Sequence, residues 1–249
     1  MKNKIIAAYE KMAEKYNELV DHKPHNAYYD RPNTLRLLPG NVNGKTILDA
    51  ACGPGKYAEI LIEKGAIVSG FDISPKMIEL AIARNSGKGE FFVHDLSVPF
   101  SMVEDSSCDI VLCALALHYI ADWNLTIREF HRVLKDNGVL VISIEHPFYE
   151  YNFFKSKRYF DVESVNCTWS GFGNPVEVNS FRRSLSECIT PITSNGFYID
   201  GPVLENNFKS FLGLHHVPIV YGMTCGEYAQ MANSEGWLKN QVKCNLSIV

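Results

Sequence analysis

The feature that most constrains this chain is an alternation of short apolar runs with helical patterns between residues 46 and 145. Short apolar runs rich in β-branched residues predict buried strands, and apolar residues at helical spacing predict helices. We expect strands over 46–50, 66–72, 90–95, 108–113 and 139–145, with helices over 56–64, from 74 onward and over about 123–134. This order predicts an α/β fold, a doubly wound parallel sheet with helices on both faces.

The flanking segments suggest a single domain over residues 1–249 in four parts. An N-terminal helical cap spans 1–40, with helices near 3–19 and over 33–38, and the core spans 41–146. Residues 147–180 are rich in Tyr, Phe, Asn and Gly without a clear period, which indicates an insertion that covers the sheet's carboxyl edge. Residues 181–249 complete the sheet, with a helix over 184–195, a strand over 197–204 and weak signals from about 209.

Charge and cysteine content exclude several classes of protein. The net charge is -4, whereas domains that hold a nucleic-acid backbone are usually basic, so we expect no nucleic-acid partner. The 7 cysteines include no Cys-x-x-Cys pair, which favours reduced thiols in the cytoplasm over disulfides or zinc. No apolar run reaches the length of a membrane span and the N-terminus lacks a signal-peptide core, so we expect no membrane partner.

The turn after the first strand carries the central binding signal, Asp49-Ala50-Ala51-Cys52-Gly53-Pro54-Gly55. Gly53 and Gly55 allow a ligand close to the backbone, and the helix expected from Lys56 directs its free N–H groups there. Neither the dinucleotide fingerprint G-x-G-x-x-G nor the phosphate loop G-x-x-x-x-G-K-[ST] is present. Because Asp49 would repel a pyrophosphate and attract an ammonium group, we expect this turn to hold an amino-acid moiety.

Acidic residues also end the next two strands. Asp72 stands where a carboxylate can accept hydrogen bonds from both hydroxyls of a ribose. The third strand ends on His94-Asp95-Leu96, where Asp95 can accept a hydrogen bond from an exocyclic amine such as that of adenine. Ligands of such sheets bind at the carboxyl ends of the strands, so a molecule that joins an amino acid, a ribose and an adenine fits these positions in order.

Together with the stretch Cys113-Ala114-Leu115-Ala116-Leu117-His118-Tyr119, these motifs resemble the class I S-adenosylmethionine-dependent methyltransferases, and most closely the UbiE/type 11 group. The resemblance covers roughly residues 5–146 and, more loosely, 180–205. It implies a Rossmann-like, seven-stranded, mostly parallel sheet with one antiparallel edge strand. It also implies the cofactor S-adenosyl-L-methionine, with S-adenosyl-L-homocysteine as product.

The resemblance further assigns parts of the cofactor to residues of this chain. It implies that Asp72 holds the ribose, Asp95 the adenine amine, and Ile73 and Met77 the adenine faces, with backbone near Ala51 and Cys113 at the methionine part. The cofactor-binding candidates are Tyr16, Asp49, Ala51, Cys52, Gly53, Gly55, Tyr57, Asp72, Ile73, Met77, His94, Asp95, Leu96, Cys113, Ala114 and His118. The chain departs from the family at Ala51, where glycine is common; alanine is tolerated at this position if its φ is negative.

Candidates for the chemistry itself are fewer. A base is needed only if the acceptor must lose a proton, and His118 and His146 are the catalytic candidates because both fall at or just after strand ends. Aromatic residues are expected to cover the cofactor, where a ring attracts the sulfonium; these are Tyr9, Tyr16, Tyr28 and Tyr57. Cys52 and Cys113 are expected to be small apolar contacts rather than nucleophiles. The pair His215-His216 has no partner ligand at a recognisable spacing, so we expect no metal.

We therefore expect a cytoplasmic S-adenosylmethionine-dependent methyltransferase that acts on a small-molecule acceptor by in-line transfer, with a homodimer as a candidate assembly. Two alternatives stay open. One is an NAD(P)-dependent oxidoreductase, against which the missing third glycine and Asp49 argue. The other is a regulatory protein that binds S-adenosylmethionine without catalysis. The accepting atom is open.

Overall fold

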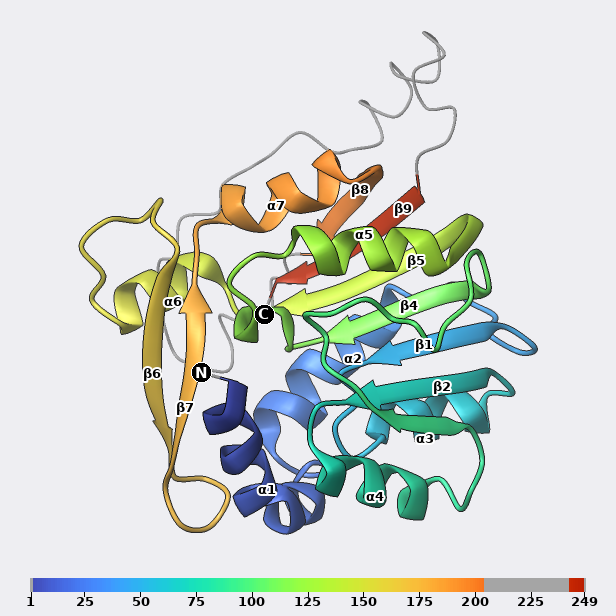
Figure 1. The fold of residues 1–249 in the computed structure, drawn as a ribbon, viewed down its shortest axis with the longest axis horizontal. Helices are drawn as coiled ribbons and strands as arrows, with labels where there is room; N and C mark the ends of the chain where they lie inside the picture. Colours follow the sequence, from blue (N-terminus) through green and yellow to red (C-terminus); the bar gives the residue numbers. More distant parts are fainter. Residues whose placement is uncertain (1, 204–241, 249) are drawn as a thin grey trace, which may run out of the picture.

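The computed structural model describes residues 2–203 and 242–248, which form a central sheet, helices on both of its faces and a separate hairpin (Figure 1). The strands are β1 Thr46–Ala50, β2 Ile67–Asp72, β3 Glu90–Val93, β4 Cys108–Ala114, β5 Leu134–Ile144, β6 Glu163–Trp169, β7 Val176–Arg182, β8 Phe197–Val203 and β9 Val242–Ile248. The α-helices are α1 Lys2–Leu19, α2 Arg31–Arg36, α3 Lys56–Glu63, α4 Pro75–Arg84, α5 Asn124–Val133, α6 Pro147–Phe153 and α7 Leu185–Ser194. A π-helix, η1, spans His25–Asp30 and a 3₁₀-helix, η2, spans Leu117–Tyr119.

The central sheet has seven strands in the order β3-β2-β1-β4-β5-β9-β8, and each described pair in it is parallel. The expected Rossmann-like α/β architecture is therefore confirmed. The expected antiparallel edge strand is wrong for the described sheet, because both edge strands, β3 and β8, run parallel to their neighbours. A parallel pair needs a connection of a dozen or more residues, and the chain between Val203 and Val242 has that length.

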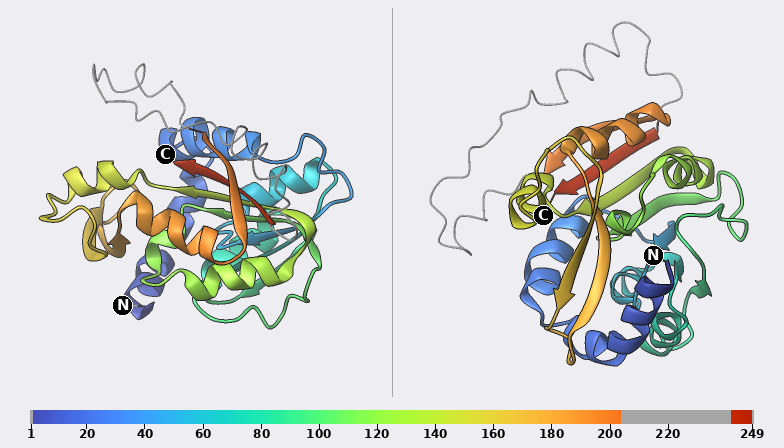
Figure 2. Two further views of the ribbon diagram at one scale, coloured as in Figure 1. Left: turned by 90° about the horizontal axis from the view of Figure 1, so that it is seen from above. Right: turned by 60° about the vertical axis from the view of Figure 1, so that its left-hand side comes forward.

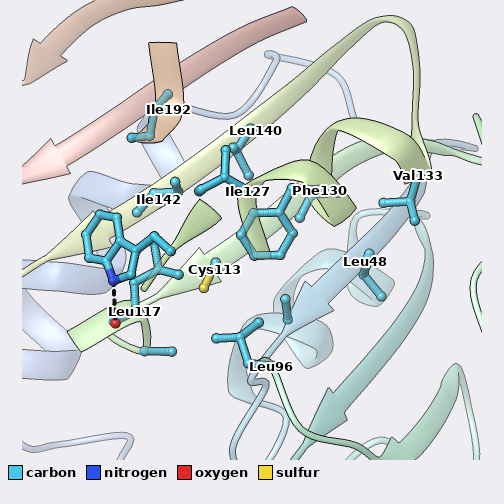
Figure 3. Packing of buried hydrophobic residues seen from close by; sticks show 14 of the residues in the cluster. Leu48, Leu96, Cys113, Leu117, Ile127, Phe130, Val133, Leu140, Ile142 and Ile192 are labelled. Atoms are coloured by element: carbon cyan, nitrogen blue, oxygen red, sulfur yellow. Dashed lines mark hydrogen bonds between the residues drawn. The ribbon is translucent and has the colours of Figure 1, made fainter. Parts of the chain in front are cut away.

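Both faces of the sheet are covered because successive strand residues point to opposite sides. Leu48 packs on one face with Phe130 of α5 and Ile192 of α7 (Figure 3). Ile47, one residue earlier, packs on the other face with Leu61 of α3. This arrangement leaves the carboxyl ends of the strands as the uncovered edge at which a ligand can bind.

Local sequence explains several element boundaries. Ser74 caps α4 by accepting a hydrogen bond from the Met77 N–H (3.1 Å), and Pro75 follows it in the first turn. Gly65 closes α3 at φ 86, a conformation that favours glycine. The helix expected over 33–38 begins earlier, at Arg31, because Pro32 is accommodated in its first turn.

Two strand boundaries and the insertion differ from the expectation. β3 ends at Val93, so His94 and Asp95 lie in the loop beyond it, and β5 begins at Leu134 rather than 139. The segment 147–180 contains helix α6 and most of an antiparallel hairpin of β6 and β7, which its mixed composition did not reveal. The segment after about 209 and His215-His216 lie outside the described residues, except for β9.

The hairpin packs against α1 at the carboxyl side of the sheet (Figure 2). Phe172 and Val178 are buried against Met12 of α1, and the Phe172 ring stacks on Tyr16 with ring centroids 4.8 Å apart. The hairpin thus supports the N-terminal helix from the side opposite α4. Among the described residues, no helix is long and apolar enough to cross a membrane.

Candidate active site

A cavity of about 480 Å³ lies at the carboxyl ends of β1, β2 and β4, with α1 and η1 forming its other wall. Twelve predicted cofactor-binding residues line it: Tyr16, Asp49, Ala51, Cys52, Gly53, Tyr57, Asp72, Ile73, His94, Asp95, Leu96 and Ala114. Residues from seven separate segments of the chain meet in one hollow, which is the arrangement that a ligand spanning several strand ends requires.

The glycine-rich turn is a run of left-handed backbone. Gly53 has φ 52 and Gly55 has φ 75, and Ala51 has φ 61, so the negative φ under which alanine is readily tolerated at this position is not found. Gly55 does not line the cavity, and a Cβ at this position would lie 2.6 Å from Nδ2 of Asn85, the residue that follows α4. Its glycine is therefore required by packing between α3 and α4 and by its φ rather than by approach to a ligand.

Asp49 is the most unusual group in the wall. It is 1% exposed, and its Oδ2 has no hydrogen-bond partner among the described residues. Burial, together with the nearby charge of Asp72, raises the pKa of Asp49 to about 7. An unpaired carboxylate in a buried wall costs free energy, which a cationic ligand would remove.

Arg31 supplies the opposite charge to the same cavity. It is 7% exposed, its NH2 group donates to the Val20 carbonyl (2.7 Å), and its Nε is buried without a partner in the described part of the chain. A guanidinium with a free N–H suits a carboxylate. Asp49 and Arg31 together fit the ammonium and the carboxylate of an amino acid.

Asp72 is oriented by the backbone around it. Its Oδ2 accepts the Gly53 N–H (3.0 Å) and its Oδ1 accepts the Ser74 N–H (2.9 Å). Burial raises the pKa of Asp72 to about 6, against the lowering effect of these hydrogen bonds. Each carboxylate oxygen retains a lone pair for another donor, so the group can also accept hydrogen bonds from a diol.

The loop after β3 adds His94, Asp95 and Leu96 to the cavity. Lys2 at the start of α1 pairs with Asp95 Oδ2 (2.6 Å), and Ser97 donates to Oδ1 through its N–H and its hydroxyl (both 2.8 Å). Burial acts to raise the pKa of Asp95, but these hydrogen bonds outweigh it and hold the pKa below its usual value. Asp95 thus stays ionised and joins α1 to the edge of the sheet.

Four predicted residues besides Gly55 stand outside the lining. Met77 and Cys113 are fully buried in the packing of α4 and β4. His118 packs on Tyr119 with ring centroids 4.1 Å apart, and burial lowers its pKa to about 4. His146 Nδ1 accepts the Phe148 N–H (3.1 Å) and so caps α6. As placed here, neither histidine reaches the cavity wall, and their catalytic assignment stays a prediction.

Sequence reasoning missed several lining residues, including Lys2, Asn26, Asp30, Arg31 and Phe181. The π-helix η1 directs Asn26 and Asp30 into the cavity, and its wider turn leaves no spacing that the sequence pattern would reveal. Asp30 is 2% exposed and accepts a hydrogen bond from the Tyr57 hydroxyl (2.7 Å). The only signal was the adjacent charges of Asp30 and Arg31 within a stretch of otherwise polar residues.

Comparison with known proteins identifies the kind of domain that carries this cavity. A family model described as a methyltransferase domain matches residues 48–142, which hold the glycine-rich turn, Asp72 and Asp95. This match and the relatives described below support a class I S-adenosylmethionine-dependent methyltransferase. The cofactor of this family is S-adenosylmethionine, and the unpaired atoms of Asp49 and Arg31 fit its amino-acid end. The same match argues against the alternative of an NAD(P)-dependent oxidoreductase.

Individual relatives show how far the similarity extends along the chain. The chain is 34% identical to an uncharacterized protein of Haemophilus influenzae over 49% of its own length and 50% of the relative. It is 33% identical to a demethylmenaquinone methyltransferase of Thermotoga maritima over 57% of this chain and 61% of that one. The similarity thus spans about half of these curated relatives.

A solved S-adenosylmethionine-dependent methyltransferase from Mesorhizobium loti is 25% identical, with a TM-score of 0.55 over 72% of this chain and 83% of that one. A second family model, the N-terminal part of the exo-beta-N-acetylmuramidase NamZ, matches residues 190–249. Most of that segment lies outside the described residues.

Proposed function

We propose that the methyltransferase moves the methyl group of S-adenosylmethionine to a small-molecule acceptor in the cavity beneath α1. The observation that carries this proposal is the buried, unpaired carboxylate of Asp49 in the wall of a cavity that also holds Asp72 and Asp95. When bound, the cofactor supplies an activated methyl sulfonium, so the protein supplies position, charge and exclusion of water.

The residues have separate tasks in this proposal. Asp49 holds the ammonium and Arg31 the carboxylate of the methionine part, while Asp72 accepts hydrogen bonds from the ribose. Asp95, already ionised, accepts the adenine amine, and Ile73 contributes an apolar surface beside the base. Because Asp49, Asp72 and Asp95 lie at the ends of neighbouring strands and Arg31 faces them from α2, they hold the reacting carbon in one place, which favours in-line displacement.

The acceptor side of the cavity is aromatic. Tyr9, Tyr16, Tyr119 and Phe181 line it, and the Tyr9 and Tyr119 hydroxyls are 2.7 Å apart. Burial raises the pKa of Tyr16 to about 12 and that of Tyr9 well above its usual value, so both stay protonated near neutral pH. A wall of neutral phenols and a phenyl ring favours an apolar acceptor of small size, and the hydroxyls can orient one polar atom of it.

Calorimetry and turnover together test this function. We expect micromolar binding of S-adenosylmethionine, no comparable binding of NADH, and S-adenosylhomocysteine formation with at least one member of a panel of small acceptors. Asp72→Asn should weaken cofactor binding by roughly 1–3 kcal/mol through the loss of a charge-assisted acceptor. The matched control is Asp136→Asn, which changes an exposed aspartate outside the cavity and should leave affinity unchanged.

The outcomes separate the parts of the proposal. Failure to bind S-adenosylmethionine would overturn the site as a whole. Binding without turnover across oxygen, nitrogen, sulfur and carbon acceptors would favour a regulatory binder instead. Equal affinities of Asp72→Asn and the wild type for S-adenosylmethionine would contradict the proposal that Asp72 binds the ribose. They would not contradict the assignment of the cofactor.

A further inference from the structure

A second surface of the molecule combines exposed aromatic rings with basic side chains. It comprises α6 and the segment that follows it, residues 147–162, which we call the aromatic-basic projection. Phe148, Tyr149, Phe153 and Phe160 are 48%, 51%, 52% and 72% exposed. Side chains of this size are normally buried, so four of them at one projecting surface indicate a contact made outside the chain.

The exposed rings form two continuous rows. Tyr149 stacks on Phe153 (centroids 5.7 Å apart), as residues four apart on a helix do. Phe148 lies beside Tyr159 (6.3 Å), which in turn contacts Phe160 (5.2 Å). The rings therefore form two clusters on the same projection instead of scattered apolar points.

Cations are interleaved with these rings. Lys155, Lys157 and Arg158 stand between Phe153 and Phe160, and all three are exposed. Asp161 offsets part of this charge through a pair with Arg158 (3.5 Å), and the other acidic residue of the projection, Glu150, is buried beneath it. The outer surface of the projection is thus positive on a chain whose net charge is -4.

The projection is held in a fixed conformation from below. Arg182 of β7, which is 0% exposed, donates to the carbonyls of Arg158 (2.9 Å) and Tyr159 (3.0 Å). The Tyr159 hydroxyl accepts the Leu185 N–H (3.0 Å). Because a buried arginine donates hydrogen bonds to the backbone of this segment, the segment that carries the exposed rings has a defined conformation.

The position of the projection in the fold relates it to the cavity. The projection follows β5 directly and lies beyond the carboxyl ends of the strands, the edge at which the cavity forms (Figure 1). The outer surface and the cavity therefore belong to the same side of the molecule.

We propose that the aromatic-basic projection docks the protein on the surface of an anionic lipid bilayer. Aromatic rings enter the boundary between headgroups and acyl chains, and lysine and arginine pair with anionic headgroups. The interleaved lysines favour a lipid surface over a protein partner, because the centres of protein–protein interfaces are depleted in lysine. Docking of this kind needs no membrane-spanning helix and no bound cofactor.

Co-sedimentation of the full chain with vesicles tests the proposal. The probes are vesicles of phosphatidylcholine alone and of phosphatidylcholine with phosphatidylglycerol at a ratio of about 7:3. We expect at least ten-fold stronger partition onto the anionic vesicles, weakened at high salt because exposed charges are screened. Lys155→Glu with Lys157→Glu should lower this partition by more than ten-fold, since each lysine near an anionic surface is worth roughly five-fold.

The matched control is Lys64→Glu with Lys88→Glu, two exposed lysines before β2 and β3 at the opposite edge of the sheet. Both double variants change the net charge from -4 by the same amount, so only the location differs. Phe153→Ser with Phe160→Ser should lower the partition that survives high salt, whereas Ile82→Ser, an exposed residue of α4 (46%), should not.

Three results would overturn the proposal. The first is the absence of binding to anionic vesicles, and the second is an equal loss of binding in the lysine control. The third is a self-associated chain in sedimentation velocity that Phe153→Ser with Phe160→Ser converts to monomer, because the projection would then be an interface between copies.

Discussion

Ala51 and Asp49 lie two residues apart in the glycine-rich turn, and each is held in a state that costs free energy. Ala51 adopts a left-handed backbone conformation that alanine rarely occupies, and Asp49 holds a carboxylate in a buried wall without a second partner. Strain of this kind persists where the surroundings over-determine it, and it concentrates at binding sites. At the scale of single residues, the turn is therefore shaped for a ligand at the expense of stability.

Replacing Ala51 with glycine tests the strain. A non-glycine residue in the left-handed region costs roughly 1–2 kcal/mol, which glycine would relieve. Glycine also loses more backbone entropy on folding, and this loss offsets about 0.5–1 kcal/mol of the gain. Ala51→Gly should therefore raise the free energy of unfolding in urea by about 0.5–1 kcal/mol. Ala83→Gly, on the exposed face of α4, should lower it by about 1 kcal/mol. A destabilised Ala51→Gly variant would show that the turn is not strained at this residue.

Replacing Asp49 with asparagine separates binding from stability. The amide removes the charge that would attract an ammonium group, so affinity for S-adenosylmethionine should fall roughly ten- to hundred-fold, as expected for a charge-assisted hydrogen bond. The unliganded variant should unfold at a higher temperature than the wild type at pH 7.5, because a buried unpaired charge is gone. Calorimetry and thermal unfolding measure the two effects. Loss of both affinity and stability would contradict the role given to Asp49.

The helices and strands couple these residues to each other. Glu10 of α1 accepts the Ser74 hydroxyl (2.5 Å) and the Lys76 N–H (3.1 Å) at the start of α4. Ser74 in turn donates its own N–H to Asp72. The N-terminal helix is thus linked through one buried serine to the carboxylate that is proposed to bind the ribose, while Lys2 links its first turn to Asp95.

Glu10→Gln should change the pH dependence of cofactor binding. The negative charge of Glu10 contributes to the raised pKa of Asp72, which lies at about 6 chiefly because of burial. Without that charge, the pH at which affinity falls by half on acidification should move down. Glu14→Gln is the control, because Glu14 lies one turn further along α1 and pairs with Lys76 Nζ (2.9 Å) but not with Ser74. Calorimetric titration from pH 5 to 8 measures the midpoint; an unchanged midpoint in Glu10→Gln would remove Glu10 from this network.

These elements also show how far sequence reasoning extends. The strand Thr46–Ala50, the cap at Ser74 and the end of β2 at Asp72 were predicted correctly, because periodicity, capping and turn chemistry act over a few neighbouring residues. The sequence pattern did not reveal α6 and the hairpin within the insertion. Trp169 and Phe172 pack against α1, so their positions follow a distant contact and not a local period. A helix more than a hundred residues earlier decided that packing.

At the scale of the whole molecule, buried acids shape the response to pH. Burial raises the pKa of Asp49 to about 7 and that of Glu150 to about 8, and a hydrogen bond with Glu145 raises the pKa of His25. In each case the folded state holds a proton that the unfolded state releases more readily. Stability from these groups is present at low pH and is lost as the pH rises through the folded-state pKa.

We therefore expect the unliganded protein to lose roughly 1–3 kcal/mol of unfolding free energy between pH 6.5 and pH 8.5. His118 and His146 have lowered pKa values when folded and titrate near pH 6.5 when unfolded, so they oppose this trend only in the lower part of the range. Urea unfolding at pH 6.5, 7.5 and 8.5 measures the slope. Asp49→Asn and Glu150→Gln should each flatten it, and so should saturating S-adenosylmethionine; a stability that rises over this range would contradict the assignment.

The sequence by itself determined the order of strands and helices between residues 46 and 145, the glycine-rich turn and the acidic residues at three successive strand ends, because each depends on neighbouring residues. The tertiary structure decided what closes the site. Lys2 reaches Asp95, Tyr9 meets Tyr119 and Phe181 enters the cavity from the hairpin. The structure also decided the parallel direction of β9 and placed His118 and His146 away from the cavity wall. These outcomes depend on contacts between residues far apart in the chain, where local periodicity carries no information on distance.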